Sequence, residues 1–286
     1  MFWGIIHKRK ASRVIAVTIG GLFVSLLAFA EDAVSPIYAE AKVHAPETAK
    51  TSLWSASVSA AFFGNYIWRG QLINDEPVFQ PNATISYDGF AASLWGNLDL
   101  TDYNESGGEF TEYDWTLSYT GNLPWFDIVS YTAGLVYYEF PDSALNTIEV
   151  FGILGLNTVL NPAISIYRDV DEYDGTYLSF GLSHSIEKIF ELASETAVGL
   201  TLSGSIGWGN NSYNKAYWSG LDENAFNDLT VIVSFPIAIG SWVISPCVNY
   251  VMLLDSDIRR ADTYAVSDST DDSEYFFAGL TISKGF

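Results

Sequence analysis

The chain has 286 residues and a formal net charge of −21, with 34 acidic against 13 basic side chains. That balance excludes nucleic acid as a partner, because binding to a phosphate backbone requires clustered Lys and Arg. One cysteine, Cys247, excludes an internal disulfide and a multi-thiolate metal site.

Residues 1–30 have the composition of a secretory signal peptide. Basic residues within 8–13 precede the apolar run 14–29, and Ala28-Phe29-Ala30 supplies a small-residue cleavage site. The apolar run is shorter than the roughly 20 residues that a spanning helix needs. We therefore expect export and cleavage, followed by a periplasmic lead-in over residues 31–52.

From residue 53 onward, apolar and polar residues alternate in segment after segment, a period-two pattern that predicts strands with two different faces. The predicted spans, with boundaries good to about 2 to 4 residues, are 53–68, 78–87, 89–101, 109–120, 126–139, 146–158, 162–170, 175–186, 195–208, 226–236, 241–254 and 274–286. An even count suits a bacterial barrel. Residues 53–286 are thus predicted to be all-β, a transmembrane antiparallel up-and-down β-barrel of twelve strands with periplasmic termini.

The predicted connections alternate in length. Asp88-Gly89 and Asn161-Pro162 are short, whereas 102–108 and 256–273 are longer and acidic. Short periplasmic turns and long external loops are typical of transmembrane barrels. One exception is 186–195, which is predicted as a long periplasmic connection that holds a single helical turn.

In the predicted strands 78–87 and 195–208 the polar face is small and uncharged, as where Gln80 and Thr84 lie opposite to Ile85. A water-facing sheet would more often carry Lys and Glu as protection against aggregation. We therefore expect the apolar face to meet lipid. Because a closed barrel has no edge for a missing N–H, a β-bulge is expected at Pro81 and at Pro246.

Aromatic residues gather near the predicted strand ends, where membrane-interface girdles form in such barrels. The predicted periplasmic girdle contains Trp54, Tyr87, Tyr119, Trp125, Trp242 and Phe286, and the predicted external girdle contains Trp68 and Trp208. The last strand alternates and ends on Phe286, with Lys284 interrupting its apolar series. Such endings resemble those of outer-membrane barrels, so the expected partners are outer-membrane lipid, lipopolysaccharide and, through this strand, the barrel-assembly machinery.

The predicted inward face carries one basic and several acidic side chains. The candidate pore-lining residues are Arg69, Asp99, Glu112, Asp114, Glu149, Asp169 and Asp228. A twelve-stranded barrel is wide enough for a narrow polar channel, in which carboxylates would favour cations. The alternative is a hydrogen-bonded network that plugs the barrel.

Three segments together carry a family resemblance. Residues 65–70 (Asn-Tyr-Ile-Trp-Arg-Gly), then Gln80-Pro81, then residues 93–97 (Ser-Leu-Trp-Gly-Asn) resemble the opening of an uncharacterised family of bacterial outer-membrane proteins, the Gcw_chp type. The resemblance covers about the first three predicted strands. It implies an outer-membrane location and a porin-like function, and it transfers no catalytic residue.

The leading hypothesis is a passive, cation-leaning outer-membrane channel for small polar solutes. The alternative is a closed structural or adaptor barrel whose acidic external loops bind lipopolysaccharide or a partner protein. An outer-membrane lipid hydrolase is a third hypothesis, because Ser183 and Ser185 flank His184. Adjacent strand residues point to opposite faces, so no catalytic residue and no enzyme is predicted. The acidic segment 169–175 does not match the spacing of a calcium loop, and no metal site or cofactor is predicted.

Overall fold

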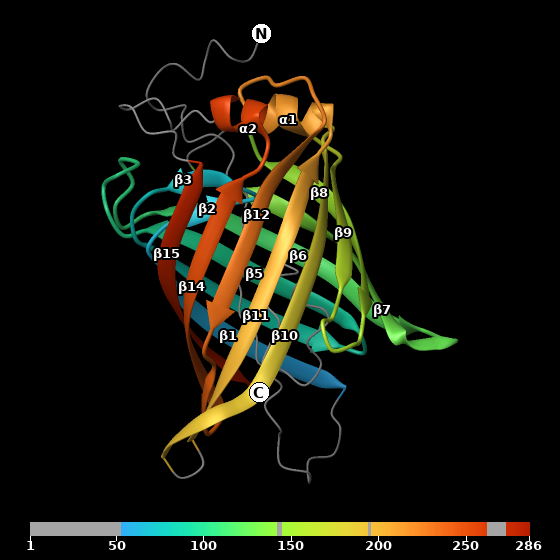
Figure 1. The fold of residues 1–286 in the computed structure, drawn as a ribbon, viewed down its shortest axis with the longest axis vertical. Helices are drawn as coiled ribbons and strands as arrows, with labels where there is room; N and C mark the ends of the chain where they lie inside the picture. Colours follow the sequence, from blue (N-terminus) through green and yellow to red (C-terminus); the bar gives the residue numbers. More distant parts are fainter. Residues whose placement is uncertain (1–52, 142–144, 194–195, 262–272) are drawn as a thin grey trace.

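The computed structural model describes residues 53–141, 145–193, 196–261 and 273–286, so the predicted signal peptide and lead-in lie outside the described residues. Within these residues, twelve strands pair antiparallel with their chain neighbours, and the first pairs with the last, which closes a barrel (Figure 1). The order around the barrel is β1-β4-β5-β6-β7-β8-β9-β10-β11-β12-β14-β15. The predicted fold class and strand count are confirmed.

The barrel strands are β1 (Trp54–Phe63), β4 (Val78–Tyr87), β5 (Phe90–Asp99), β6 (Phe110–Leu123), β7 (Phe126–Glu139), β8 (Thr147–Leu156), β9 (Ala163–Asp169), β10 (Thr176–Ala193), β11 (Thr196–Gly209), β12 (Ala225–Ser234), β14 (Trp242–Leu253) and β15 (Glu274–Gly285). The connections hold β2 (Tyr66–Trp68), β3 (Gln71–Asn74), α1 (Asn211–Tyr217), β13 (Ile237–Ile239) and α2 (Ser256–Ala261). Among the described helices, none has the length and apolarity needed to cross a membrane.

The two ends of the barrel differ as predicted. The end that we call the loop end carries α1, α2 and the β2–β3 hairpin (Figure 1). The opposite end, the turn end, has short connections such as Asp88-Gly89, where φ is +47° and +85°. Positive φ at both residues is the geometry of a two-residue hairpin turn that matches strand twist. That the turn end lies in the periplasm stays a prediction.

The barrel is polar inside and apolar outside. Ile85 and Ile164 are each 51% exposed on the outer face, whereas their neighbours Thr84 and Ser165 are 5% and 1% exposed on the inner face. A soluble domain has the reverse arrangement. The predicted alternation of faces is therefore confirmed, and the apolar outer surface is that of a barrel suited to hydrocarbon.

The first predicted strand is wrong at its end. It was predicted to reach residue 68, but β1 ends at Phe63, and the Gly64 amide donates the last ladder hydrogen bond to Ala278. Residues 66–74 form the separate β2–β3 hairpin. The chain leaves the wall there because its side chains find partners inside the barrel, described below.

Two further predictions are wrong. No helical turn forms over 186–193, because β10 continues to Ala193 and pairs with β11 through a register irregularity. No bulge forms at either proline. The β4–β5 register is unchanged on both sides of Pro81, where the ladder only omits the two pairs that residues 80 and 81 would form. Pro246 faces the break between β12 and β13, so its missing N–H is not needed there, and its carbonyl accepts a hydrogen bond from the Phe235 amide.

The predicted girdle residues separate into two groups. The turn-end group is exposed on the outer surface and comprises Trp54, Tyr87, Tyr119, Trp125, Trp242 and Phe286. Lys284 lies outside with them, its ammonium 5.2 Å from the Trp242 ring and 4.7 Å from the Phe286 ring. Trp208 is half-buried. The placement of Trp68 is wrong, because it is fully buried inside the barrel on β2. Contact with lipid headgroups stays a prediction for the others.

Candidate functional site

The β2–β3 hairpin turns on two residues, Arg69 and Gly70, between the paired Trp68 and Gln71. Both turn residues have positive φ, +45° for Arg69 and +86° for Gly70. This turn type favours Asn, Asp or Gly, and a left-handed conformation costs another residue about 1 to 3 kcal/mol. The turn itself therefore disfavours Arg69, and interactions of its side chain must compensate for the strain.

The Arg69 guanidinium makes a two-pronged ion pair with Glu149 on β8. Its Nη1 donates to Oε1 at 2.9 Å and its Nη2 donates to Oε2 at 2.7 Å. The Tyr138 hydroxyl on β7 donates to the same Oε2 at 2.9 Å. Both ionic side chains are about 1% exposed. Planar, two-pronged Arg–carboxylate geometry is the strongest form of such a contact.

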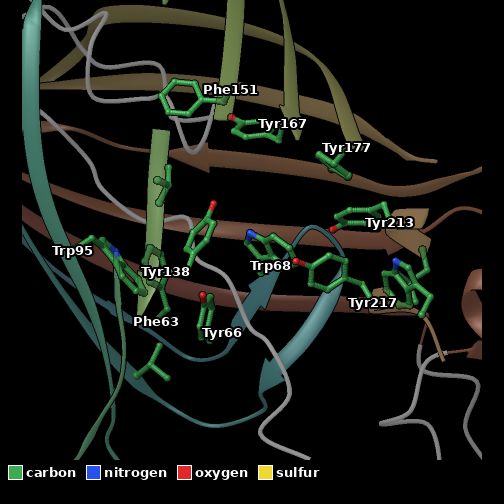
Figure 2. Close-up of a cluster of buried hydrophobic side chains, with 14 of the residues drawn as sticks. Phe63, Tyr66, Trp68, Trp95, Tyr138, Phe151, Tyr167, Tyr177, Tyr213 and Tyr217 are labelled. Atoms are coloured by element: carbon green, nitrogen blue, oxygen red, sulfur yellow. The ribbon is translucent and has the colours of Figure 1, made fainter. Parts of the chain in front are cut away.

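Four aromatic rings surround the same guanidinium. Figure 2 shows how these rings, of Trp68, Tyr167, Tyr177 and Tyr213, lie relative to one another. The guanidinium carbon lies 4.4 Å from the ring centroids of Trp68 and Tyr167, 4.6 Å from that of Tyr177 and 5.8 Å from that of Tyr213. Cations within about 6 Å of an aromatic face are attracted by the ring quadrupole, most strongly where water is excluded. Three of these rings belong to the wall and its cap, on β9, β10 and α1, and only Trp68 belongs to the hairpin.

Gly70, at the tip of the hairpin, contacts the barrel strands β12 and β14 on the opposite side of the interior. A Cβ added at Gly70 would lie 2.8 Å from Leu253 Cδ2 on β14 and 2.9 Å from Asp228 Cβ on β12. Asp228 itself accepts a hydrogen bond of 2.8 Å from the Tyr177 hydroxyl. The hairpin starts between β1 and β4 and its tip contacts β8, β9, β10, β12 and β14. It therefore crosses the whole interior at the loop end.

The base of the hairpin is also fixed. The buried Tyr66 hydroxyl donates to Glu112 Oε2 on β6 at 3.0 Å, and its ring lies 6.1 Å from that of Trp95. On the other arm, the Ile73 carbonyl accepts a hydrogen bond from Asn104. Contacts at the tip and at the base together hold the hairpin in one position.

Helix α1 covers this cluster from the loop end. The Asn210 side chain caps the helix by accepting from the Tyr213 amide at 2.9 Å. Tyr213 and Tyr217, four residues apart, share the helix face that points at the hairpin (Figure 2). Burial raises the pKa of both hydroxyls well above the ordinary value, so both stay protonated donors. At the exposed side, a hydrogen bond from Lys215 lowers the pKa of Asp222.

All seven candidate pore-lining residues are buried, but they serve different contacts. Arg69, Glu112, Glu149 and Asp228 meet at the hairpin, and Arg69 comes from the hairpin turn rather than from the first strand. Asp114 is buried on β6, two residues from Glu112.

Two of the seven organise loops instead. Asp99 accepts from the side chains of Asn97, Asn104 and Ser106. Asp169 accepts from Thr147 and from backbone amides of 171 and 173. One oxygen is thus used within its own loop and the other joins that loop to β8. Among the described residues, no group of three or more His, Cys, Asp or Glu is placed to hold a metal ion.

Toward the turn end, the inner face changes to small hydroxyl side chains. The buried inward residues there include Ser57, Thr84, Ser118, Ser130, Thr132, Ser183, Thr201, Ser203, Ser245 and Ser283. Several of these hydroxyls, such as those of Ser245 and Ser283, have no hydrogen-bond partner within the described residues. Buried polar atoms of this kind are normally satisfied by water. The turn-end half is therefore a hydratable lining.

The Ser-His-Ser segment of β10 does not form a catalytic arrangement. Ser183 is buried on the inner face, and Ser185 shares a hydrogen bond with Thr201 on the neighbouring strand β11. The His184 ring lies on the other face, where Nδ1 is 2.7 Å from the Val159 carbonyl oxygen. Among the residues that the structure describes, no serine hydroxyl is hydrogen-bonded to this imidazole. That the chain is not an enzyme stays a prediction.

Sequence reasoning missed the residues that surround Arg69, namely Trp68 as an interior residue, Gly70, Tyr167, Tyr177 and Tyr213. A signal exists for two of them. Tyr167 and Tyr177 occupy inward positions of strands whose other inward residues are small, such as Ser165 and Ser179. A large aromatic in such a series indicates a filled position in the interior. For Tyr213, in a connection, no periodic signal exists.

Comparisons with known proteins return structures but no sequence relatives. No protein-family model matches the chain, and no curated protein matches it. Similar solved structures include a NanC porin (13% identity, 80% of this chain and 98% of that chain, TM-score 0.48). They also include LpxR from Salmonella typhimurium (10% identity, 80% of this chain and 99% of that chain, TM-score 0.42). A third is a bacterial polysaccharide outer membrane secretin (8% identity, 82% of this chain and 98% of that chain, TM-score 0.40). The assignment of the chain to the closed twelve-stranded antiparallel barrels rests on its own strand pairing.

Proposed function

We propose that the chain is an outer-membrane channel for small polar solutes, with a preference for cations, and that the docked β2–β3 hairpin is its closed gate. The observation that carries the proposal is a hairpin held across the interior by polar contacts, chiefly the Arg69–Glu149 pair. A buried ion pair is often no more stabilising than apolar packing of the same volume. A permanent plug could therefore be built from apolar side chains, whereas a gate that must move through water needs polar surfaces.

The rest of the lumen supports a polar pathway. Hydroxyl side chains line the turn-end half, and carboxylates surround the hairpin at the loop end. Acidic linings favour cations over anions. Export by the predicted signal peptide, insertion through the final strand and contact with lipopolysaccharide belong to the same proposal. The resemblance to the Gcw_chp type agrees with it.

A closed structural or adaptor barrel is the second candidate. It is favoured by the number of contacts that hold the hairpin and by the acidic residues of the loop-end connections. In that case the interior network would serve stability, and the loops would bind lipopolysaccharide or a partner protein.

The test is single-channel conductance in a planar bilayer, with the reversal potential under a KCl gradient. The chain is compared with a variant in which residues 66–74 are replaced by a Gly-Ser segment of equal length. We expect rare, small openings for the unaltered chain and cation-selective steps at least tenfold more frequent or larger for the variant. Silence of both proteins, with heat-modifiable migration proving that they are folded, would refute the channel and favour the adaptor.

A further inference from the structure

The guanidinium of Arg69 occupies a site whose other walls do not belong to the hairpin. Glu149 on β8, Tyr167 on β9, Tyr177 on β10 and Tyr213 on α1 form this site, which we call the wall cage. The hairpin supplies the cation and the Trp68 ring. If the hairpin withdraws, the carboxylate and three rings remain, arranged around the space that a flat cation has left.

The chain places an arginine here against the preference of the turn. Arg69 adopts φ +45° at a turn position that suits Asn, Asp or Gly. The identity of this residue is therefore explained by the wall cage and not by the hairpin. A site that selects a guanidinium from the chain itself has the chemistry to select one from solution.

Charge around the wall cage points to the same ligand class. Arg69 is the only buried basic side chain in the described part of the chain, and Glu112, Glu149 and Asp228 are buried near the docked hairpin. Without Arg69 the region would be strongly negative. Carboxylates with aromatic faces match guanidinium and alkylammonium groups, and they repel carboxylate and phosphate solutes.

One polar atom at the edge of the cage has no protein partner in the described part of the chain. The Tyr217 hydroxyl on α1 is buried without a hydrogen bond in the described residues. Tyr217 is 8% exposed, and its ring centroid lies 5.2 Å from that of Trp68 (Figure 2). Because Tyr217 is on α1, its hydroxyl stays when the hairpin withdraws and can donate to an acceptor on the body of a bound solute.

We propose that the wall cage is a binding site for organic cations with a guanidinium or ammonium head, and that Arg69 is a tethered surrogate of that ligand. A solute cation and Arg69 then compete for Glu149, which couples binding to release of the hairpin. The physiological meaning of the site rests on the channel proposed above, but binding itself does not require conduction.

The test is titration of the folded full chain with methylguanidinium, followed by tryptophan fluorescence. The main variant is Arg69→Gly, because glycine adopts the turn conformation freely. Urea, neutral and similar in shape, is the control ligand. We expect saturable binding to R69G that is at least tenfold tighter than to the unaltered chain, no saturable response to urea, and at least tenfold weaker binding when Glu149→Gln is added.

Equal responses to methylguanidinium and urea, or binding to R69G that is unaffected by E149Q, would overturn the proposal. So would absence of a saturable response from R69G whose heat-modifiable migration shows a folded barrel. If R69G does not fold, Arg69→Asn suits the same turn and takes its place. Binding without conductance would leave the site standing and refute the channel, whereas conductance without binding would refute the site alone.

Discussion

The two halves of the barrel interior are built by the same strands but with different chemistry. Along β9 and β10, Ser165 and Ser179 give way to Tyr167 and Tyr177 over two residues toward the loop end. The turn-end half is lined by small hydroxyls, and the loop-end half holds charge and aromatic rings around a docked hairpin. The wall alone supplies only a polar lining, whereas charge and aromatic rings are concentrated where the chain folds back into the interior. If the chain is the channel proposed above, selectivity and closure belong to that loop-end half.

The largest expected effect on the loop-end half comes from removing the Glu149 carboxylate, which pairs with Arg69. Glu149→Gln leaves a buried guanidinium without its counter-charge, which costs about 3 to 5 kcal/mol of hairpin docking. Amide hydrogen exchange over 66–74 should accelerate at least a hundredfold, while exchange in β14 stays unchanged. The control is Asp174→Asn, which removes the exposed pair with Arg168 and should cost less than about 1 kcal/mol. Equal protection of the hairpin in E149Q and in the unaltered chain would show that the Arg69–Glu149 pair does not hold the hairpin in place.

A steric change at the hairpin tip should have a somewhat smaller effect. Gly70→Ala places a methyl group against Leu253 and Asp228 and adds left-handed strain, so we expect about 2 to 3 kcal/mol of weakened docking. Gly108→Ala is the matched control, because Gly108 has φ +80° but nothing within 4 Å of its added Cβ. Channel openings should increase for G70A only. Similar behaviour of the two variants would mean that the tip contact is unimportant.

Removing one hydrogen bond to Glu149 should weaken hairpin docking less than either change above. Tyr138→Phe deletes the hydroxyl that donates to Glu149, with an expected cost of about 1.5 kcal/mol. Tyr137→Phe, next on the same strand, removes a hydroxyl that accepts from Asn146 instead. Hydrogen exchange over 66–74 should rise about tenfold in Y138F and remain unchanged in Y137F. The reverse order would show that the network around Glu149 does not support the hairpin.

The turn-end half should respond least in stability. Ser245→Val removes a buried hydroxyl with no protein partner in the described residues, so the expected change in unfolding free energy is below about 1 kcal/mol. Conductance of the variant lacking the hairpin should fall, because an apolar side chain disfavours water in the lining. Unchanged conductance, with Ser245→Ala as the size control, would place the pathway elsewhere.

Local pattern explains why the barrel could be predicted and the hairpin could not. Alternation and turn residues act over a few positions, so the strands, the inward face and the unequal connections follow from the sequence. Docking depends on pairs far apart, such as Arg69 with Glu149, 80 residues later in the chain. Tyr66 and Trp68 also continue the even-numbered apolar series of β1, and Asn65 and Arg69 continue its polar series. Periodicity alone therefore extends the strand through the point where it turns inward. The inward register of the acidic residues predicted that they are buried. It did not predict which of them contact the hairpin and which of them organise loops.

The position of the hairpin near the beginning of the barrel has a consequence for assembly. Residues 66–74 are made before every strand that holds the tip, and the last of those strands, β14, ends at Leu253. Contacts over such sequence separations form late, because loop closure must come first. The tip can reach all its partners only after the wall from β4 to β14 exists, so its docking reports that most of the circumference has been completed in the right order.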